Sequence, residues 1–273
     1  MIAHGSAFPV AKLALNSSVP PILMASLRMG FVFILLIPFL NFKLPEKKFL
    51  KALIIFSISM GVLVYMFMNL SLYHSSIISP IILGSQLAIP FGILASALIL
   101  KENISRNKWF LIFSSFIGIL IIFFDPKLSE NYLGLFFASL MALFFGLSQV
   151  YSRQLKELPL SLINACTGIF GFIILLMISI SFEGNVYFNI LKINNETWIL
   201  ILYQAIIVSL CAHLLMFYLY KFYTVGQIFP FYSLFPIFGI ILTYLVFGEV
   251  PTVLFIMGGI IVISSVFLLH KIE

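Results

Sequence analysis

Two basic side chains lie in or beside long apolar stretches of this sequence. Arg28 is about six residues into the run 22–42, roughly 9 Å from its nearer end at 1.5 Å per helical residue. Lys12 is close to the end of the run 1–15, and Arg153 is its approximate counterpart later in the chain. A cation at such a position can hold a carboxylate or phosphate of a ligand. It can equally extend to lipid headgroups or bond backbone carbonyls of a neighbouring helix.

Uncharged polar side chains form a second group of candidates. Gln86, Gln149 and Ser233 are embedded in apolar runs, where an amide or hydroxyl group could bind a ligand. The alternative is a hydrogen bond between helices, which contributes about 0.6 kcal/mol in membrane proteins. Three other side chains carry a weaker form of the same prediction: Tyr65, Asn69 and Tyr232.

Prolines and repeated glutamates are candidates for structural roles. Pro90, Pro230 and Pro236 interrupt apolar runs, where each proline frees a carbonyl and bends the helix. Such breaks can act as hinges or expose backbone groups, and fixed curvature is the alternative. Glu102 and Glu249 stand at helix ends beside tight turns, so we expect each to bond backbone amides at the start of the next helix.

The composition requires a membrane around these residues. Of 273 residues, 62% are hydrophobic and 9% charged, which leaves too few charges to cover a surface facing water. The net charge of +6 does not indicate nucleic acid, because the basic residues are confined to short breaks between apolar runs. The sequence predicts an all-α integral membrane protein with ten transmembrane helices, near 1–15, 22–42, 50–71, 76–99, 108–124, 131–151, 160–182, 196–219, 228–247 and 252–270.

The basic residues also predict an orientation. If the amino terminus is cytoplasmic, eleven Lys and Arg residues fall on the inner side and three, Lys12, Lys127 and Lys192, on the outer side. We therefore expect both termini in the cytoplasm of a cell whose inner (plasma) membrane holds the protein. The run 1–15 is short for a span, so we expect either an unusually short first helix or missing residues before it.

The chain repeats itself in two halves. Residues 87–102 (LAIPFGILASALILKE) align with residues 234–249 (LFPIFGIILTYLVFGE) at a constant offset, in the fourth helix of each half. Gln86 and Ser233 occupy matching positions in this alignment. An odd number of helices in each half inserts the halves in opposite directions. We therefore predict two inverted five-helix repeats, residues 1–125 and 126–273, with a ligand site between them.

These features together resemble the ten-helix, EamA-type branch of the drug/metabolite transporter superfamily. Residues 4–13 (HGSAFPVAKL) resemble the first-helix motif of that family, although His4 replaces its usual Trp. Lys101-Glu102 and Gly248-Glu249 resemble its two helix-ending Gly-Glu turns, and residues 230–236 (PFYSLFP) resemble its ninth-helix pattern. The resemblance implies alternating access to a central cavity for a small polar metabolite, such as an amino acid or an amino-acid or nucleotide-like derivative.

Titratable groups limit how such transport could be driven. All nine acidic residues lie in connections or at helix ends, and His213 is the only histidine well inside a run. A proton carrier needs a group that titrates within the pathway. We therefore expect facilitated diffusion or exchange, and the alternative is a proton-coupled efflux pump that uses His213, a residue that packing could also explain.

Other classes of function find little support. The sequence has no HExxH, GxSxG or CxxC motif and no acidic residue inside a predicted span, so we expect no enzyme. Cys166 and Cys211 fit no metal site, and we expect neither a metal nor a cofactor. A channel or a scaffold remains an alternative that saturable transport would exclude. The expected partners are a small-molecule substrate and the lipid bilayer, and we expect a monomer or a homodimer.

Overall fold

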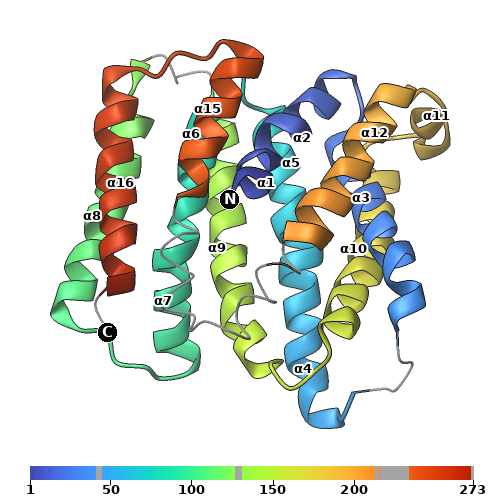
Figure 1. Ribbon diagram of the computed structural model, residues 1–273, viewed down its shortest axis with the longest axis horizontal. Helices are drawn as coiled ribbons and strands as arrows, with labels where there is room; N and C mark the ends of the chain where they lie inside the picture. The colour runs from blue at the N-terminus through green and yellow to red at the C-terminus, as the bar shows by residue number, and fades with distance from the viewer. Residues whose placement is uncertain (41–44, 127–130, 213–214, 216–233, 272–273) are drawn as a thin grey trace.

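A computed structural model describes residues 1–40, 45–126, 131–212, 215 and 234–271. Helices joined by short connections make up this part of the chain, which contains no strand (Figure 1). The helices of the first half are α1 (Ile2–Gly5), α2 (Ala7–Asn16), α3 (Pro21–Leu36), η1 (Ile37–Phe39), α4 (Lys47–Phe56), η2 (Ser57–Val64), α5 (Tyr65–Tyr73), α6 (Ser79–Gly84), η3 (Ser85–Leu87), α7 (Ala88–Ile99) and α8 (Arg106–Phe123).

The second half contains fewer described elements. They are α9 (Tyr132–Gln154), α10 (Leu160–Phe182), α11 (Val186–Leu191), α12 (Asn195–Tyr203), η5 (Gln204–Ala212), α15 (Phe235–Phe247) and α16 (Val253–Lys271). The short helix α11 lies in the segment that we expected to be a plain connection. The Asn185 side chain accepts a hydrogen bond from the Phe188 N–H at its start, which is a cap that favours helix.

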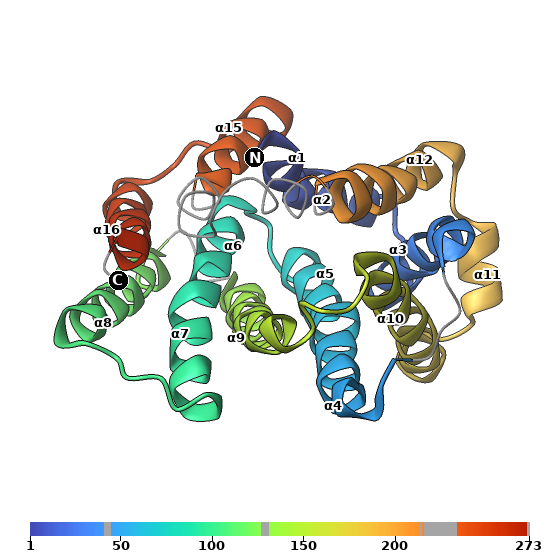
Figure 2. The same ribbon diagram turned by 60° about the horizontal axis from the view of Figure 1, so that its bottom comes forward.

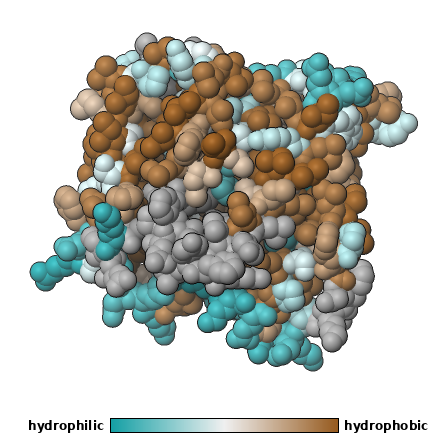
Figure 3. Space-filling view, in the orientation of Figure 1, coloured by the Kyte–Doolittle hydropathy of each residue, from teal (hydrophilic) through white to brown (hydrophobic). Residues whose placement is uncertain are grey.

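The described helices suit a bilayer. Seven continuous helical stretches, some of which combine consecutive elements such as α4, η2 and α5, are long and apolar enough to cross a membrane. Phe235–Phe247 and Val253–Leu269 are shorter apolar helices. Large apolar side chains point outward along their length, for example Leu98 and Phe182, each 82% exposed. Figure 3 shows the same pattern: apolar surface covers the helix bodies on the visible face, and hydrophilic groups gather at its margins. Lipid is therefore the surrounding that this surface requires.

Charged side chains are sorted between the two ends of the helices. The end drawn lowest in Figure 1, where α4, α8 and α10 begin, is called the basic end below. Its described basic residues are Lys47, Lys48, Lys51, Lys101, Arg106, Lys108, Arg153, Lys156 and Lys271. The opposite end, where α3, α6 and α12 begin, carries Lys12 and Lys192.

Glycines allow several helices to approach closely. A Cβ atom added to Gly61 would lie 2.4 Å from the Thr167 carbonyl oxygen, which brings η2 against α10. One added to Gly258 would lie 2.5 Å from the Gly118 oxygen, at the contact between α16 and α8 that Figure 2 shows at one side of the molecule. Small residues at such contacts let helix backbones approach closely, and the resulting van der Waals packing stabilises helix association in lipid, where the hydrophobic effect does not drive it.

The contact between α7 and α9 offers a test of this packing. A Cβ at Gly146 would lie 2.6 Å from both the Ala88 oxygen and the Gly92 nitrogen, and these backbone atoms cannot move aside alone. We expect Gly146→Ala to destabilise the protein by about 1–3 kcal/mol, the usual cost of overpacking. The measurement is thermal unfolding of the purified protein in detergent. Gly92→Ala is the matched control, because its Cβ would meet its nearest atom, the Gly146 oxygen, at 3.5 Å, and should change little.

Candidate functional site

Arg28 lies inside the protein, where both halves of the chain reach it. It is on α3 and 3% exposed, and its Nε atom donates a hydrogen bond of 3.0 Å to the Ser209 hydroxyl on η5. Its guanidinium carbon lies 4.3 Å from the centre of the Tyr65 ring, at the start of α5. A desolvated cation over an aromatic face gains about 2 kcal/mol. The predicted candidates Arg28 and Tyr65 are therefore in contact.

The positive charge of Arg28 has no carboxylate partner among the described residues. The ion pairs in that part of the chain join Lys48 to Glu46 and Glu157, and Arg153 to Glu102, all at the basic end. A hydroxyl group and a ring offset only part of the cost of burying a charge, which is several kcal/mol per ion. An anionic group bound beside Arg28 would supply the missing compensation.

Arg28 contacts a residue of one π-helical segment and the residue that follows another. Tyr65 directly follows η2, and Ser209 belongs to η5. η2 begins at Ser57 and η5 begins at Gln204, which is 147 positions later. The same offset of 147 positions relates the two copies of the sequence repeat, which begin at Leu87 and Leu234. π-helical turns widen a helix locally and occur often at functional sites. Neither segment was predicted from the sequence, because both were expected to be ordinary helix.

Gln204 is a buried polar residue that the sequence analysis missed. It is fully buried at the start of η5, and its Nε2 atom donates to the Ala7 carbonyl oxygen at 2.6 Å. Because a carbonyl can only accept, this bond fixes the orientation of the amide. The Oε1 atom then has no hydrogen-bond partner. One turn further along, Ser209 binds Arg28. A glutamine within an apolar run, at the position that repeats Ser57, was the signal available in the sequence.

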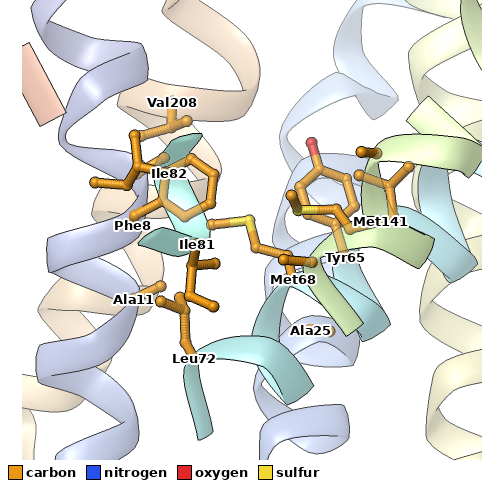
Figure 4. Packing of buried hydrophobic residues seen from close by; sticks show 14 of the residues in the cluster. Phe8, Ala11, Ala25, Tyr65, Met68, Leu72, Ile81, Ile82, Met141 and Val208 are labelled. Atoms are coloured by element: carbon orange, nitrogen blue, oxygen red, sulfur yellow. The ribbon is translucent and has the colours of Figure 1, made fainter. Parts of the chain in front are cut away.

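Figure 4 shows part of the apolar core, which includes Tyr65 and also Val208, the residue before Ser209. Val208 of η5 lies with Phe8 of α2 and Ile82 of α6, while Tyr65 and Met68 of α5 lie close to Met141 of α9. Phe8 also stacks against Phe235 of α15, with ring centres 6.4 Å apart. The residues near Arg28 thus belong to the main hydrophobic core of the protein.

Gln86 and Gln149 lie on other helical segments. Gln86 is 1% exposed on η3, and its Oε1 atom has no hydrogen-bond partner. Gln149 is half-buried on α9. Within the described residues, no hydrogen bond joins either side chain to Arg28. The tight turn at η3 has a physical cause, since Pro90 lacks the N–H that would bond the Gln86 carbonyl in a regular α-helix.

Asn69 and Lys12 bind backbone groups in this structure. Asn69 is buried on α5, and its Nδ2 atom donates to the Pro21 carbonyl oxygen at 2.9 Å, which ties α5 to the start of α3. The Lys12 ammonium group donates to the carbonyl oxygens of Leu72 at 2.7 Å and Ser75 at 2.6 Å. It therefore satisfies carbonyls at the end of α5, where a cation also complements the helix dipole.

The two repeated glutamates behave differently from each other. Glu249 bonds backbone amides as expected, but those of Ile78 and Ser79 at the start of α6, not those of the next helix α16. Glu102 instead accepts a bond of 3.2 Å from Arg153, at a solvent-exposed position. Spacing along the chain could not reveal a partner that only tertiary packing brings close.

The remaining candidates are only partly placed. Pro236 is buried in the first turn of α15, where the missing N–H of proline has no partner to lose. Four predicted residues lie outside the described part of the chain: Ser233, Tyr232, Pro230 and His213. The part of the chain that is described contains no group of three or more His, Cys, Asp or Glu residues that could hold a metal ion.

Apolar helices of membrane-spanning length, packed around a buried cation, define a polytopic helical membrane protein. The family model described as the EamA-like transporter family matches residues 1–124 and 132–270. The chain therefore belongs to the EamA-like transporter family, which confirms the resemblance found in its sequence motifs.

Comparisons with individual proteins add the fold alone. One solved crystal structure, described only as that of a protein, matches with a TM-score of 0.62 over 100% of this chain and 97% of that chain. The two sequences are 15% identical. No curated protein matches this sequence.

Proposed function

We propose that this transporter carries a small polar metabolite with an anionic group across the membrane, by facilitated diffusion or exchange. The substrate class is an amino acid or an amino-acid or nucleotide-like derivative. The observation that carries the proposal is the burial of Arg28 with no described carboxylate to balance its charge. A substrate carboxylate or phosphate would be held by the guanidinium group, beside the Ser209 hydroxyl.

Alternating access would act through the two halves of the chain, residues 1–125 and 126–273, as inverted five-helix repeats in a ten-helix protein. Arg28 and Tyr65 belong to the first half, and Ser209 belongs to the second. The shared separation of 147 positions between the π-helical segments supports the same division. A substrate at Arg28 would then touch both repeats, so a relative movement of the repeats could change the side from which it is reached.

The charge distribution supports an orientation for this proposal. The basic end would face the cytoplasm, following the bias of Lys and Arg residues in membrane proteins. The carboxyl terminus, which lies at this end in Figure 1, would then be cytoplasmic, in the inner membrane of the cell. We propose the same side for the amino terminus, which Figure 1 draws about halfway along the helices. The protein would act as a monomer or a homodimer. A reporter fused after Glu273 that proved to be extracytoplasmic would contradict this orientation.

A competition screen in proteoliposomes tests the function directly. Labelled amino acids, nucleotides and methylated metabolites would be offered in turn, and each inhibitor would be compared with a methyl ester that removes negative charge from its carboxylate or phosphate. We expect saturable uptake that the anionic compound inhibits and the ester does not, because only the anion compensates Arg28. Linear flux without saturation would indicate a channel instead. Equal inhibition by acid and ester would contradict an anion site.

A further inference from the structure

Glu183 joins the end of a helix in the second half to the start of a helix in the first half. It follows α10, and its Oε1 and Oε2 atoms accept hydrogen bonds from the backbone N–H groups of Ile22 at 2.7 Å and Leu23 at 2.8 Å. These N–H groups belong to the first turn of α3 and have no partner within the helix. The Ser179 hydroxyl donates to Oε2 at 2.7 Å and orients the carboxylate.

Glu249 makes the same kind of contact elsewhere at the same end of the molecule. It follows α15, and its two oxygens accept from the N–H groups of Ile78 at 2.8 Å and Ser79 at 3.1 Å, at the start of α6. The Ser79 hydroxyl donates a third bond of 2.9 Å. Both carboxylates are half-buried, and both bind pairs of successive amides with a negative charge at the positive end of a helix dipole.

Further bonds strengthen the region around Glu249. Lys12 binds carbonyl oxygens at the end of α5, and the Asn131 side chain accepts from the Ser76 N–H at 2.7 Å and from the Ser75 hydroxyl at 3.0 Å. The turn between α5 and α6 is thus held from α2, from the residue before α9 and from the residues after α15. These elements converge at the upper end of the molecule in Figure 1.

The basic end joins the halves by different polar contacts. There the described polar contacts between the halves are ion pairs, Arg153 with Glu102 at 3.2 Å and Lys48 with Glu157 at 3.7 Å. Apolar packing joins the halves there as well, because α4 shares a buried cluster with the end of α9 and the start of α10. The four side chains of the ion pairs are between 49% and 63% exposed. Exposed ion pairs are screened by water and salt and contribute little. Charged hydrogen bonds to two helix starts are the stronger polar connection, so the two ends differ in the polar contacts that join the halves.

We propose that Glu183 and Glu249 are positioning residues that close the Arg28 site at the end where α3 and α6 begin. Access to the site from that end requires both carboxylates to release their amides. The proposal rests on alternating access, and it names the residues that stabilise the conformation closed at this end. It does not depend on the identity of the substrate, because the contacts are made within the protein.

Cysteine labelling from either side of the membrane tests this proposal. The reporter is Ala25→Cys, which lies three residues before Arg28 on α3 and is fully buried, in a background of Cys166→Ser and Cys211→Ser. An impermeant maleimide is applied to intact spheroplasts and to inverted vesicles. We expect the reporter cysteine in the double variant Glu183→Ala, Glu249→Ala to react about tenfold faster from the closed end and more slowly from the basic end. The reason is that a shift between two conformations increases access from one side and decreases access from the other.

The control is Asn194→Ala. Asn194 caps α12 at the same end by accepting from the Thr197 N–H at 2.8 Å, but this bond lies within one segment and joins no two helices. We expect this variant to leave both labelling rates unchanged. If the double alanine variant does not fold, Glu183→Gln and Glu249→Gln keep one acceptor oxygen and should shift the rates in the same direction by less.

Two outcomes would overturn the proposal. Unchanged labelling from the closed end in folded Glu variants would show that the carboxylates do not close it. A rise from both sides together would indicate general loosening of the fold. Labelling needs no substrate, so either result is independent of whether Arg28 binds an anion. Conversely, equal inhibition by the acid and its ester in the competition screen would contradict the proposed substrate class. It would not affect the interpretation of the labelling rates.

Discussion

Replacing Arg28 with Gln is expected to weaken binding of an anionic substrate by about 10- to 100-fold, because a hydrogen bond to a charged group contributes about 1.5–3 kcal/mol. The reason is the environment of Arg28, which is 3% exposed and pairs with no described carboxylate. The measurement is the apparent affinity for transport in proteoliposomes, or direct binding in detergent. The same substitution should leave the empty protein as stable as before, or more so, because it removes a buried charge.

Two companion variants separate charge from geometry at this site. Arg28→Lys keeps a positive charge but loses the planar fork that grips a carboxylate, so we expect an intermediate loss. Tyr65→Phe keeps the ring 4.3 Å from the guanidinium carbon and should have a small effect. Unchanged affinity of Arg28→Gln for every anionic or zwitterionic substrate would contradict the proposal. Arg28 would then serve only to bind Ser209 and the Tyr65 ring.

The seven candidate spans among the described residues could be predicted from the sequence because each is a long apolar run between charges. The run near 160–182, for example, is the helix Leu160–Phe182. Arg28 was accessible for the opposite reason, since a charge within such a run is costly and therefore conspicuous. Neither inference needs knowledge of which helices are neighbours.

The partners of these residues could not be read from the sequence. Ser209 is one of many serines in apolar runs, and nothing in its neighbours indicates that Arg28 binds it. The π-helical turns that bring it there depend on packing between helices and not on local propensity. Glu183 looked like an ordinary loop acid, yet it accepts from two amides about 160 positions earlier in the chain.

The largest effect expected in a transport assay concerns energy coupling. We expect no accumulation of substrate above its external concentration when a pH gradient alone is imposed on proteoliposomes. A gradient of two pH units stores about 2.7 kcal/mol per proton, so coupling to one proton would give about 100-fold accumulation. The physical reason is that every described Asp and Glu side chain lies at or beyond a helix end, such as Glu183, Glu249 and Glu102. Among the described residues, no carboxylate lies further into a span than Glu196, which is in the first turn of α12.

The controls identify the proton carrier if this expectation is wrong. Preloading the vesicles with unlabelled substrate should accelerate uptake without any gradient, as exchange requires. Uphill accumulation on the pH gradient that His213→Gln abolished, with exchange intact, would support the proton-coupled alternative suggested by the sequence. Accumulation that Glu183→Gln or Glu249→Gln abolished would instead identify those carboxylates as the coupled groups, since a protonated carboxylate loses the charge that binds the amides of α3 or α6.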